Sequence, residues 1–146
     1  MIQDQECEDV RAFSQKLGMI EFRTPGHITK RLAQERGHMM LEEVNEFIDG
    51  VEENDLAKMA DALIDLVYFA KGTALKLGLP WVALWADVQR ANMAKERGTN
   101  KRGFKVDAVK PPGWMGPNTS LILAAHGYVP EDWKDRTKYR DETDNV

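Results

Sequence analysis

Clustered carboxylates with the spacing of a divalent-metal site are the most informative feature of the sequence. Residues 42–65 contain nine acidic residues and one lysine, and five of the acids stand at helical spacings within apolar stretches: Glu42, Glu43, Glu46, Asp61 and Asp65. A helix turns by about 100° per residue, so the three glutamates share one sector of a helix and the two aspartates are stacked on another. Carboxylates without histidine or cysteine partners favour Mg²⁺ or Mn²⁺ and a substrate that contains phosphate.

The elements that must position these acids are helices. Apolar periodicity and helix-stop residues predict helices over residues 4–17, 28–49, 55–77 and 81–95, and a shorter one over 119–126. This pattern predicts an all-α fold with a four-helix-bundle-like core over residues 1–128, followed by a charged C-terminal tail over 129–146. The third helix is apolar on nearly every side and so has more apolar surface than the core of a monomer needs. We therefore expect a homodimer or homotetramer that associates through helices.

The second and third predicted helices would bring the two groups of acids together. If these helices pack antiparallel across the short polar loop DGVEEND, their carboxylates meet near one end of the pair. Asp61 and Asp65 stand among apolar residues, and we expect them to be partly buried. An unpaired buried carboxylate costs several kcal/mol, and a bound cation would offset that cost.

Charge is distributed unevenly along the chain, although the net charge is only −4. Residues 42–65 carry a net charge of −8, whereas residues 89–110 carry +5 from seven basic residues and two acids. The negative net charge argues against nucleic acid as a partner, because proteins bind nucleic acid through a basic surface. Metal-bound carboxylates and basic side chains are the two parts that phosphoryl-transfer sites usually combine.

The sequence also predicts where the protein works. No stretch approaches about 18 uninterrupted apolar residues and the acidic N-terminus has no apolar core, so we expect neither a membrane span nor a signal peptide. The single cysteine, Cys7, cannot form an internal disulfide, which fits a reducing compartment. The expected location is the cytoplasm, or the host cytoplasm if the chain is phage-encoded.

The motifs EEVNE (residues 42–46), DALIDLVYFA (61–70) and ANMAK (91–95) resemble the all-α nucleoside triphosphate pyrophosphohydrolases. This superfamily includes MazG, phosphoribosyl-ATP pyrophosphohydrolase, dimeric dUTPases and dCTP pyrophosphatases, and its signature is EExxE followed by ExxD. EEVNE matches the first half and Asp65 the closing aspartate. The residue three before Asp65 is Ala62 instead of glutamate, and we interpret Asp61 as its substitute.

The resemblance implies roles for particular residues. Glu43, Glu46 and Asp65 would bind two or three Mg²⁺ or Mn²⁺ ions, with Glu42 as a further ligand and Asp61 as the substitute ligand. Glu42 and Glu43 would be the catalytic residues, which orient the attacking water and accept its proton. The expected substrate-binding residues are Asn92, Lys95, Lys71, Lys101, Arg102, Lys105, Lys110 and Trp114.

The implied reaction is hydrolysis of a (d)NTP to (d)NMP and pyrophosphate, with no nucleophilic side chain. Our first guess for the substrate is (d)GTP, because the loop around Trp114 could form one side of a wide pocket. Family members remove unwanted triphosphates or supply a chosen monophosphate, including in phages. One alternative is a phosphoribosyl-ATP pyrophosphohydrolase. Another is a non-catalytic helical dimer whose acidic end binds a metal or a basic partner.

Overall fold

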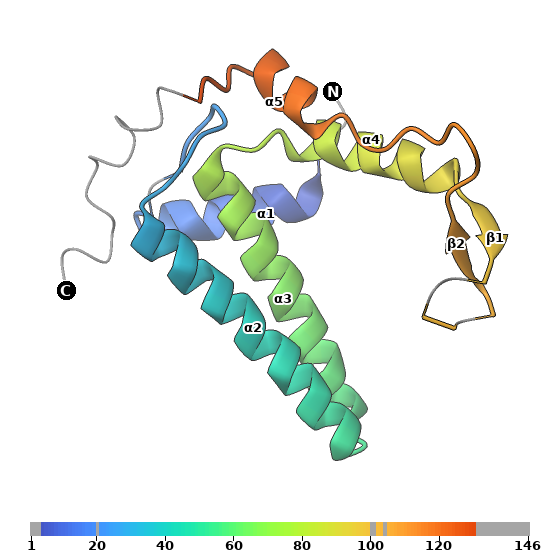
Figure 1. Cartoon of the computed structure of the whole chain (residues 1–146). Coiled ribbons are helices and arrows are strands. Elements are labelled where there is room, and N and C mark those ends of the chain that lie inside the picture. Colours follow the sequence, from blue (N-terminus) through green and yellow to red (C-terminus); the bar gives the residue numbers. More distant parts are fainter. Residues whose placement is uncertain (1–3, 20, 100–101, 104, 131–146) are drawn as a thin grey trace.

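The computed structural model describes residues 4–19, 21–99, 102–103 and 105–130, and its all-α class confirms the prediction (Figure 1). Of the predicted tail, residues 131–146 lie outside this range. The elements in chain order are α1 (Gln5–Lys16), α2 (Lys30–Glu52), α3 (Leu56–Leu77), α4 (Trp81–Met93), β1 (Glu96–Gly98), β2 (Asp107–Val109) and α5 (Thr119–Ala125). The short hairpin formed by β1 and β2 was not predicted from the sequence.

Helices α2 and α3 form a long antiparallel hairpin. Side chains cap both helices at their first turns: the Thr29 hydroxyl accepts a hydrogen bond from the Leu32 N–H, and the Asp55 carboxylate accepts one from the Lys58 N–H. At the turn, a Cβ atom on Gly50 would lie 2.8 Å from the Met59 side chain. Glycine at position 50 therefore allows the two helices to approach closely at the closed end of the hairpin.

Helix α1 and the segment that follows it pack against α3. Val10 is buried in this contact. Further along, the N–H of Gly26 donates to the carbonyl of Leu77 at 3.0 Å, and Gly78 ends α3 in the left-handed conformation with φ of 67°. A Cβ on Gly78 would collide with the Thr24 carbonyl. The end of α3 is thus fixed by backbone contacts on both sides.

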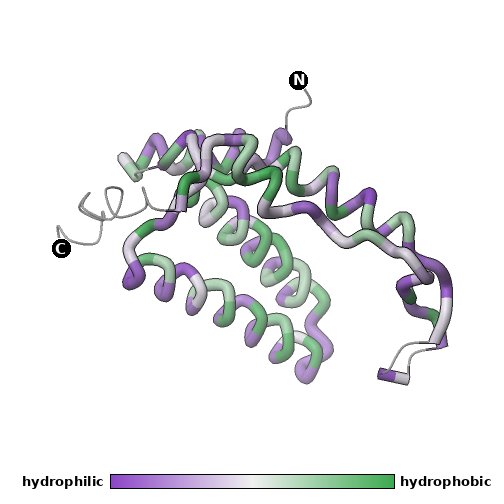
Figure 2. The backbone as a smooth tube through the Cα atoms, turned by 45° about the horizontal axis from the view of Figure 1, so that its top comes forward, coloured by the Kyte–Doolittle hydropathy of each residue, from purple (hydrophilic) through white to green (hydrophobic). Residues whose placement is uncertain are grey.

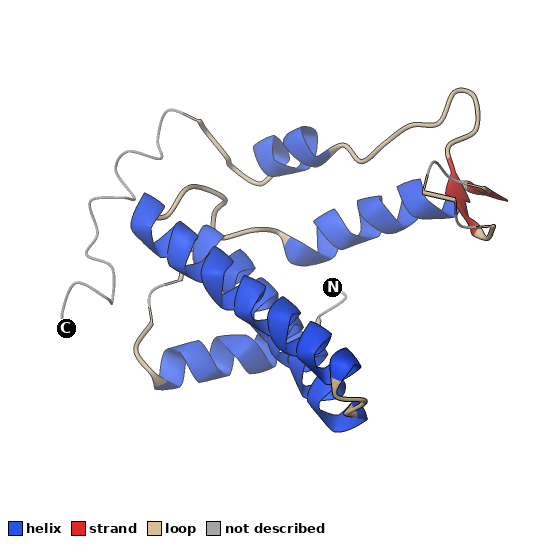
Figure 3. Ribbon diagram, turned by 60° about the horizontal axis from the view of Figure 1, so that its bottom comes forward, coloured by secondary structure: helices blue, strands red, loops and turns tan. Residues whose placement is uncertain are grey.

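Helix α4 leads away from the α2–α3 hairpin and ends in the small β1–β2 sheet (Figure 3). The strands are antiparallel, with Arg97 opposite Ala108. The chain then returns along α4, where the indole Nε1 of Trp114 donates to the Ala91 carbonyl at 2.8 Å, before α5 packs on α4. The indole of Trp114 thus anchors the Gly- and Pro-rich loop on α4.

Much of the apolar surface of α2 and α3 is uncovered in the single chain. Figure 2 shows that α3 is apolar along much of its length. Val44 and Ile48, whose spacing predicts a core position, are 38% and 51% exposed, and Ile64 is 67% exposed. The core position predicted by this spacing is wrong for both residues, because α3 is the main element packed against α2 among the described residues. No helix in the described part of the chain is both long enough and apolar enough to cross a membrane.

Candidate active site

The α2–α3 hairpin brings Glu43 and Asp65 side by side. Gly50 and Met59 face each other near its closed end. Seven residues back from Gly50 along α2 is Glu43, and six residues forward from Met59 along α3 is Asp65. Because both helices rise by about 1.5 Å per residue, the two acids stand at nearly the same height above this contact.

Electrostatics confirm that the carboxylates around Glu43 interact. Burial raises the pKa of Glu43 above its ordinary value, and the negative charges of Glu46, Asp65 and Glu42 raise it further. One of its oxygens, Oε2, is buried and accepts no hydrogen bond within the described part of the chain. A buried oxygen without a donor, in a field of three other carboxylates, is chemically suited to a hard divalent cation.

The other four acids do not have the burial that was predicted for two of them. Asp61 and Asp65 are exposed, as are Glu42 and Glu46, so the expected partial burial of the aspartates was wrong. The reason is that no element of the described part of the chain covers that side of α3. As the side chains stand, no three acid, imidazole or thiol groups among the described residues converge enough to hold an ion. Ligation would need changes of the exposed rotamers.

Position 62, where the sequence departs from the ExxD pattern, lies inside the helical hairpin. Ala62 is 1% exposed, whereas Asp61 is exposed one position earlier. Ala62 precedes Asp65 by three residues and so shares its side of α3. The missing glutamate therefore corresponds to a buried position beside the acids, and the substitute role of Asp61 stays a prediction.

A second group of predicted residues gathers at the end of α4. The ammonium of Lys95 donates to the Asn92 side-chain oxygen at 2.9 Å, and it lies 5.4 Å from the ring centre of Trp114. The ammonium of Lys110 lies 4.7 Å from the same ring. The structure thus brings together four of the predicted substrate-binding residues, two of them basic.

The remaining basic candidates have other surroundings. The Lys71 side chain is only 8% exposed and pairs with Asp4 and Glu6, both at 2.7 Å, so it points toward α1. Burial acts to lower the pKa of Lys71, but hydrogen bonds to these two acids outweigh it and the net shift is upward. Arg102 pairs with Asp107 at 3.0 Å. Lys105 is exposed, and Lys101 lies outside the described residues.

Among the residues that the structure describes, the acids do not meet the basic group at the end of α4 within one chain. The acids lie in the half of the α2–α3 hairpin toward its closed end, whereas Asn92 and Lys95 lie at the far end of α4 beside the β1–β2 sheet. Figures 1 and 3 both show α4 leading away from this hairpin. A site that uses both groups thus needs either movement of α4 or a second copy of the chain.

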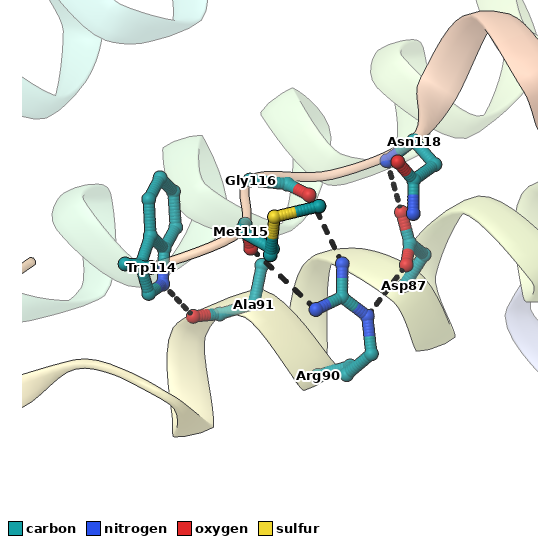
Figure 4. A network of polar contacts seen from close by, with 7 residues as sticks. All are labelled: Asp87, Arg90, Ala91, Trp114, Met115, Gly116 and Asn118. Carbon is teal, nitrogen blue, oxygen red and sulfur yellow. Dashed lines mark hydrogen bonds and ion pairs between the residues drawn. The ribbon is translucent and has the colours of Figure 1, made fainter. Parts of the chain in front are cut away.

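The sequence interpretation missed the residues that hold the Trp114 loop in place. Asp87 and Arg90 on α4 contact the backbone of Met115, Gly116 and Asn118 (Figure 4). The only signal in the sequence was an acid and an arginine three residues apart, which is common on exposed helices.

An open groove of about 860 Å³ lies between α1, α3 and the start of α4. Its lining includes Trp81 and Trp85, whose rings are stacked with centres 6.4 Å apart. Lys71 also lines the groove, and its ammonium lies 5.5 Å from the Trp81 ring centre. Aromatic rings of this kind can stack on a base, although packing is their more common role.

Residues 10–92 match the family model for phosphoribosyl-ATP pyrophosphohydrolase, a range that contains all five acids and ends at Asn92. The chain belongs to this family. It is therefore a member of the all-α NTP pyrophosphatase, or MazG-like, superfamily, as the motifs indicated. Family membership indicates a hydrolase with pyrophosphohydrolase activity on a nucleotide, without specifying which one. No curated protein matches the sequence.

Proposed function

We propose that the protein is a metal-dependent nucleoside triphosphate pyrophosphohydrolase that converts a (d)NTP and water to (d)NMP and pyrophosphate. The observation that carries this proposal is the buried oxygen of Glu43, which has no partner among the described residues, beside Glu42, Glu46 and Asp65 within the family-matched range. The charges of Glu42, Glu46 and Asp65 all act on Glu43, and a cation that also binds phosphate would offset this repulsion once exposed rotamers bring the carboxylates to it.

The carboxylates have two tasks in this reaction. Glu43, Glu46 and Asp65 would hold Mg²⁺ or Mn²⁺, with Glu42 and Asp61 as the outer candidates. When bound, the ions supply positive charge that attracts phosphate oxygens and offsets the charge that develops on the leaving pyrophosphate. The raised pKa of Glu43 makes it a stronger base than an ordinary glutamate, which suits it to accept the proton of the attacking water, with Glu42 to orient that water.

The basic end of α4 would bind the substrate. Lys95 and Asn92 offer an ammonium and an amide to phosphate oxygens, and Lys110 adds a second positive charge at the same indole ring. Positive groups placed beside the transferring phosphates stabilise the transition state electrostatically. The chain thus carries acidic side chains for the metal ions on α2 and α3, and basic side chains for the phosphates on other elements.

We infer that a second copy of the chain covers the apolar surface of the α2–α3 hairpin. This inference is supported by the exposed side chains of Val44, Ile48 and Ile64, which form more apolar surface than a monomer usually leaves in water. Analytical ultracentrifugation should give at least a dimer, and Ile48→Glu together with Ile64→Glu should reduce its mass to that of one chain. A monomeric wild type at micromolar concentration would contradict this.

Two substrate classes should be compared directly. Our first choice is (d)GTP, and the alternative is phosphoribosyl-ATP, which appears in the name of the matched family. Both contain the same α–β phosphoanhydride, so the chemistry of the carboxylates is identical for both.

The test is product analysis with the eight common NTPs and dNTPs and with phosphoribosyl-ATP, in Mg²⁺ or Mn²⁺. We expect a monophosphate and pyrophosphate from one of them, with activity lost in Glu46→Gln and Asp65→Asn. Glu52→Gln is the matched control, because Glu52 is an exposed acid at the end of α2, outside the cluster. If no substrate is turned over, or if the control loses as much activity as the two variants, the proposal fails.

A further inference from the structure

Two side chains of α4 fasten the loop after Trp114 to the helix. One oxygen of the Asp87 carboxylate accepts a hydrogen bond from the Asn118 N–H at 2.5 Å, and the other accepts one from Arg90 Nε at 2.8 Å. Arg90 also donates from Nη2 to the Gly116 carbonyl at 3.0 Å and, more weakly, from Nη1 to that of Met115 at 3.5 Å (Figure 4). We name this arrangement of Asp87 and Arg90 the α4 clamp.

The α4 clamp depends on side-chain geometry as well as charge. The flat guanidinium of Arg90 reaches one carboxylate and two carbonyls at once, and a lysine ammonium cannot copy that fork. The Asp87 side chain is 14% exposed, and the hydrogen bond from Asn118, followed by that from Arg90, lowers its pKa. Asp87 is therefore ionised at neutral pH, and its hydrogen bonds are charge-assisted.

The clamped loop begins beside Trp114, whose ring gathers two positive charges. Its indole N–H is fixed to the Ala91 carbonyl at 2.8 Å. The ammonium groups of Lys95 and Lys110 lie 5.4 and 4.7 Å from the ring centre. Each ammonium group is attracted to the face of the ring, but the two ammonium groups repel each other. An anion with several oxygens would relieve this repulsion by contacting both ammonium groups.

We propose that Asp87 and Arg90 are positioning residues, which hold Trp114 where its ring brings Lys95 and Lys110 together as a binding site for the pyrophosphate portion of a nucleotide. The identity of this anion rests on the proposed function. The two residues touch no substrate themselves, and they act by fixing the path of the loop between Trp114 and Asn118. If the loop were released, both lysines would remain charged but would no longer share one ring.

The direct test is calorimetric binding of inorganic pyrophosphate to the full chain without divalent metal. We expect Arg90→Gln to weaken binding about tenfold, because the loss is comparable to one charge-assisted contact. Arg90→Lys should weaken it by nearly as much, although it keeps the charge. Arg97→Gln is the matched control: it removes one arginine from exposed β1 in the same basic region and should change the affinity less than about twofold.

A double variant at Arg90 and Lys110 tells whether Arg90 acts on binding by positioning Lys110 or through a general effect on folding. If the α4 clamp acts through Lys110, Arg90→Gln should cost much less in a Lys110→Gln background than in the wild type. Wild-type affinity in Arg90→Lys, additive losses in the double variant, or no binding of pyrophosphate by the wild type would each overturn the proposal. Far-ultraviolet circular dichroism and thermal unfolding would verify that Arg90→Lys and Arg90→Gln are folded.

Once a substrate is known, KM and kcat of the variants give a second test of the positioning role. Arg90→Lys should raise KM about tenfold and leave kcat nearly unchanged, because the clamp affects binding of the substrate before its chemistry. A variant that lowers kcat and leaves KM unchanged would contradict the positioning role. If the wild type turns over no nucleotide, the proposed function fails, while pyrophosphate binding still tests the α4 clamp.

Discussion

Replacing Glu43 by glutamine should stabilise the metal-free protein at neutral pH. Burial raises the pKa of Glu43, the charges of Glu46, Asp65 and Glu42 raise it further, and its Oε2 has no hydrogen-bond donor within the described residues. Glutamine removes one charge from this group, and its amide N–H can donate to a neighbouring carboxylate. The substitution therefore relieves repulsion and adds a donor where none is present.

The size of the effect follows from the three neighbours. A like-charge pair at helical spacing, such as Glu43 and Glu46, costs about 0.2–0.5 kcal/mol. Asp65 acts across the hairpin and Glu42 is the adjacent residue, so we take the relief of all three repulsions to be on the order of 1 kcal/mol. For a chain of this length, that free energy raises the Tm by roughly 2–4 °C. The gain should vanish as the pH falls below about 4.5, the ordinary pKa of glutamate, because Glu43 is then protonated and uncharged in the folded and unfolded wild type.

The assay is thermal unfolding in chelator and again in millimolar Mg²⁺ or Mn²⁺. The wild type should gain stability on adding metal, because a ligand that binds only the folded state stabilises it, whereas Glu43→Gln should gain much less. Glu52→Gln, a change of the same kind outside the cluster, should move the Tm little in either condition. A lower Tm for metal-free Glu43→Gln, or an equal response to metal in both proteins, would refute the reasoning.

Three further substitutions test other parts of the structure. Lys71→Met should destabilise the protein by about 1–3 kcal/mol, since it breaks a mostly buried pair with Asp4. The hydrogen bond from Lys71 lowers the pKa of Asp4, so the stabilising effect of the pair is lost when Asp4 is protonated, and chemical unfolding should show the difference between variant and wild type shrinking as the pH falls below about 3.8. Ala62→Glu should lower the Tm in chelator more than in Mg²⁺, because it buries a further carboxylate beside Asp65; equal losses in both conditions would argue against a metal site there. Gly78→Ala should cost about 2–4 kcal/mol in urea unfolding, because its left-handed φ and the nearby Thr24 carbonyl both exclude a side chain, and a loss below about 1 kcal/mol would contradict this.

Local signals in the sequence were sufficient for the helices. The cap Asp55 and the stop Gly78 set the bounds of α3, and the predicted end of α4 at position 95 differs from the observed end by only two residues. The β1–β2 hairpin could not be predicted in the same way, because its strands have three residues each and lie in a basic segment without alternating apolar residues. Short strands depend on pairing partners that periodicity does not show.

The grouping of Glu43 with the neighbouring acids was predictable from the sequence, but their burial and their separation from the basic residues were not, and the roles given to these residues stay predictions. Helical spacing was enough to relate Glu43 to Glu46, and an antiparallel hairpin was enough to add Asp65. The burial of Asp61 and Asp65 was wrong because hydrophobic periodicity shows that a face is apolar without showing which chain covers it. Lys71 was misjudged for a related reason: its partner Asp4 lies 67 positions away, and contacts of that kind leave no local pattern.

The short connection between α2 and α3 has a consequence for the order in which the chain folds. Three residues join these helices, so most of their contacts close small loops, whereas the Lys71–Asp4 pair and the His27–Tyr128 contact close loops of 67 and 101 positions. Loop-closure entropy favours early formation of the nearer contacts. In pulse-labelled hydrogen exchange, the amides of α2 and α3 should gain protection before those of α1. The acids would then be assembled on a helical hairpin that precedes the rest of the fold, so that their mutual repulsion opposes one of its first steps.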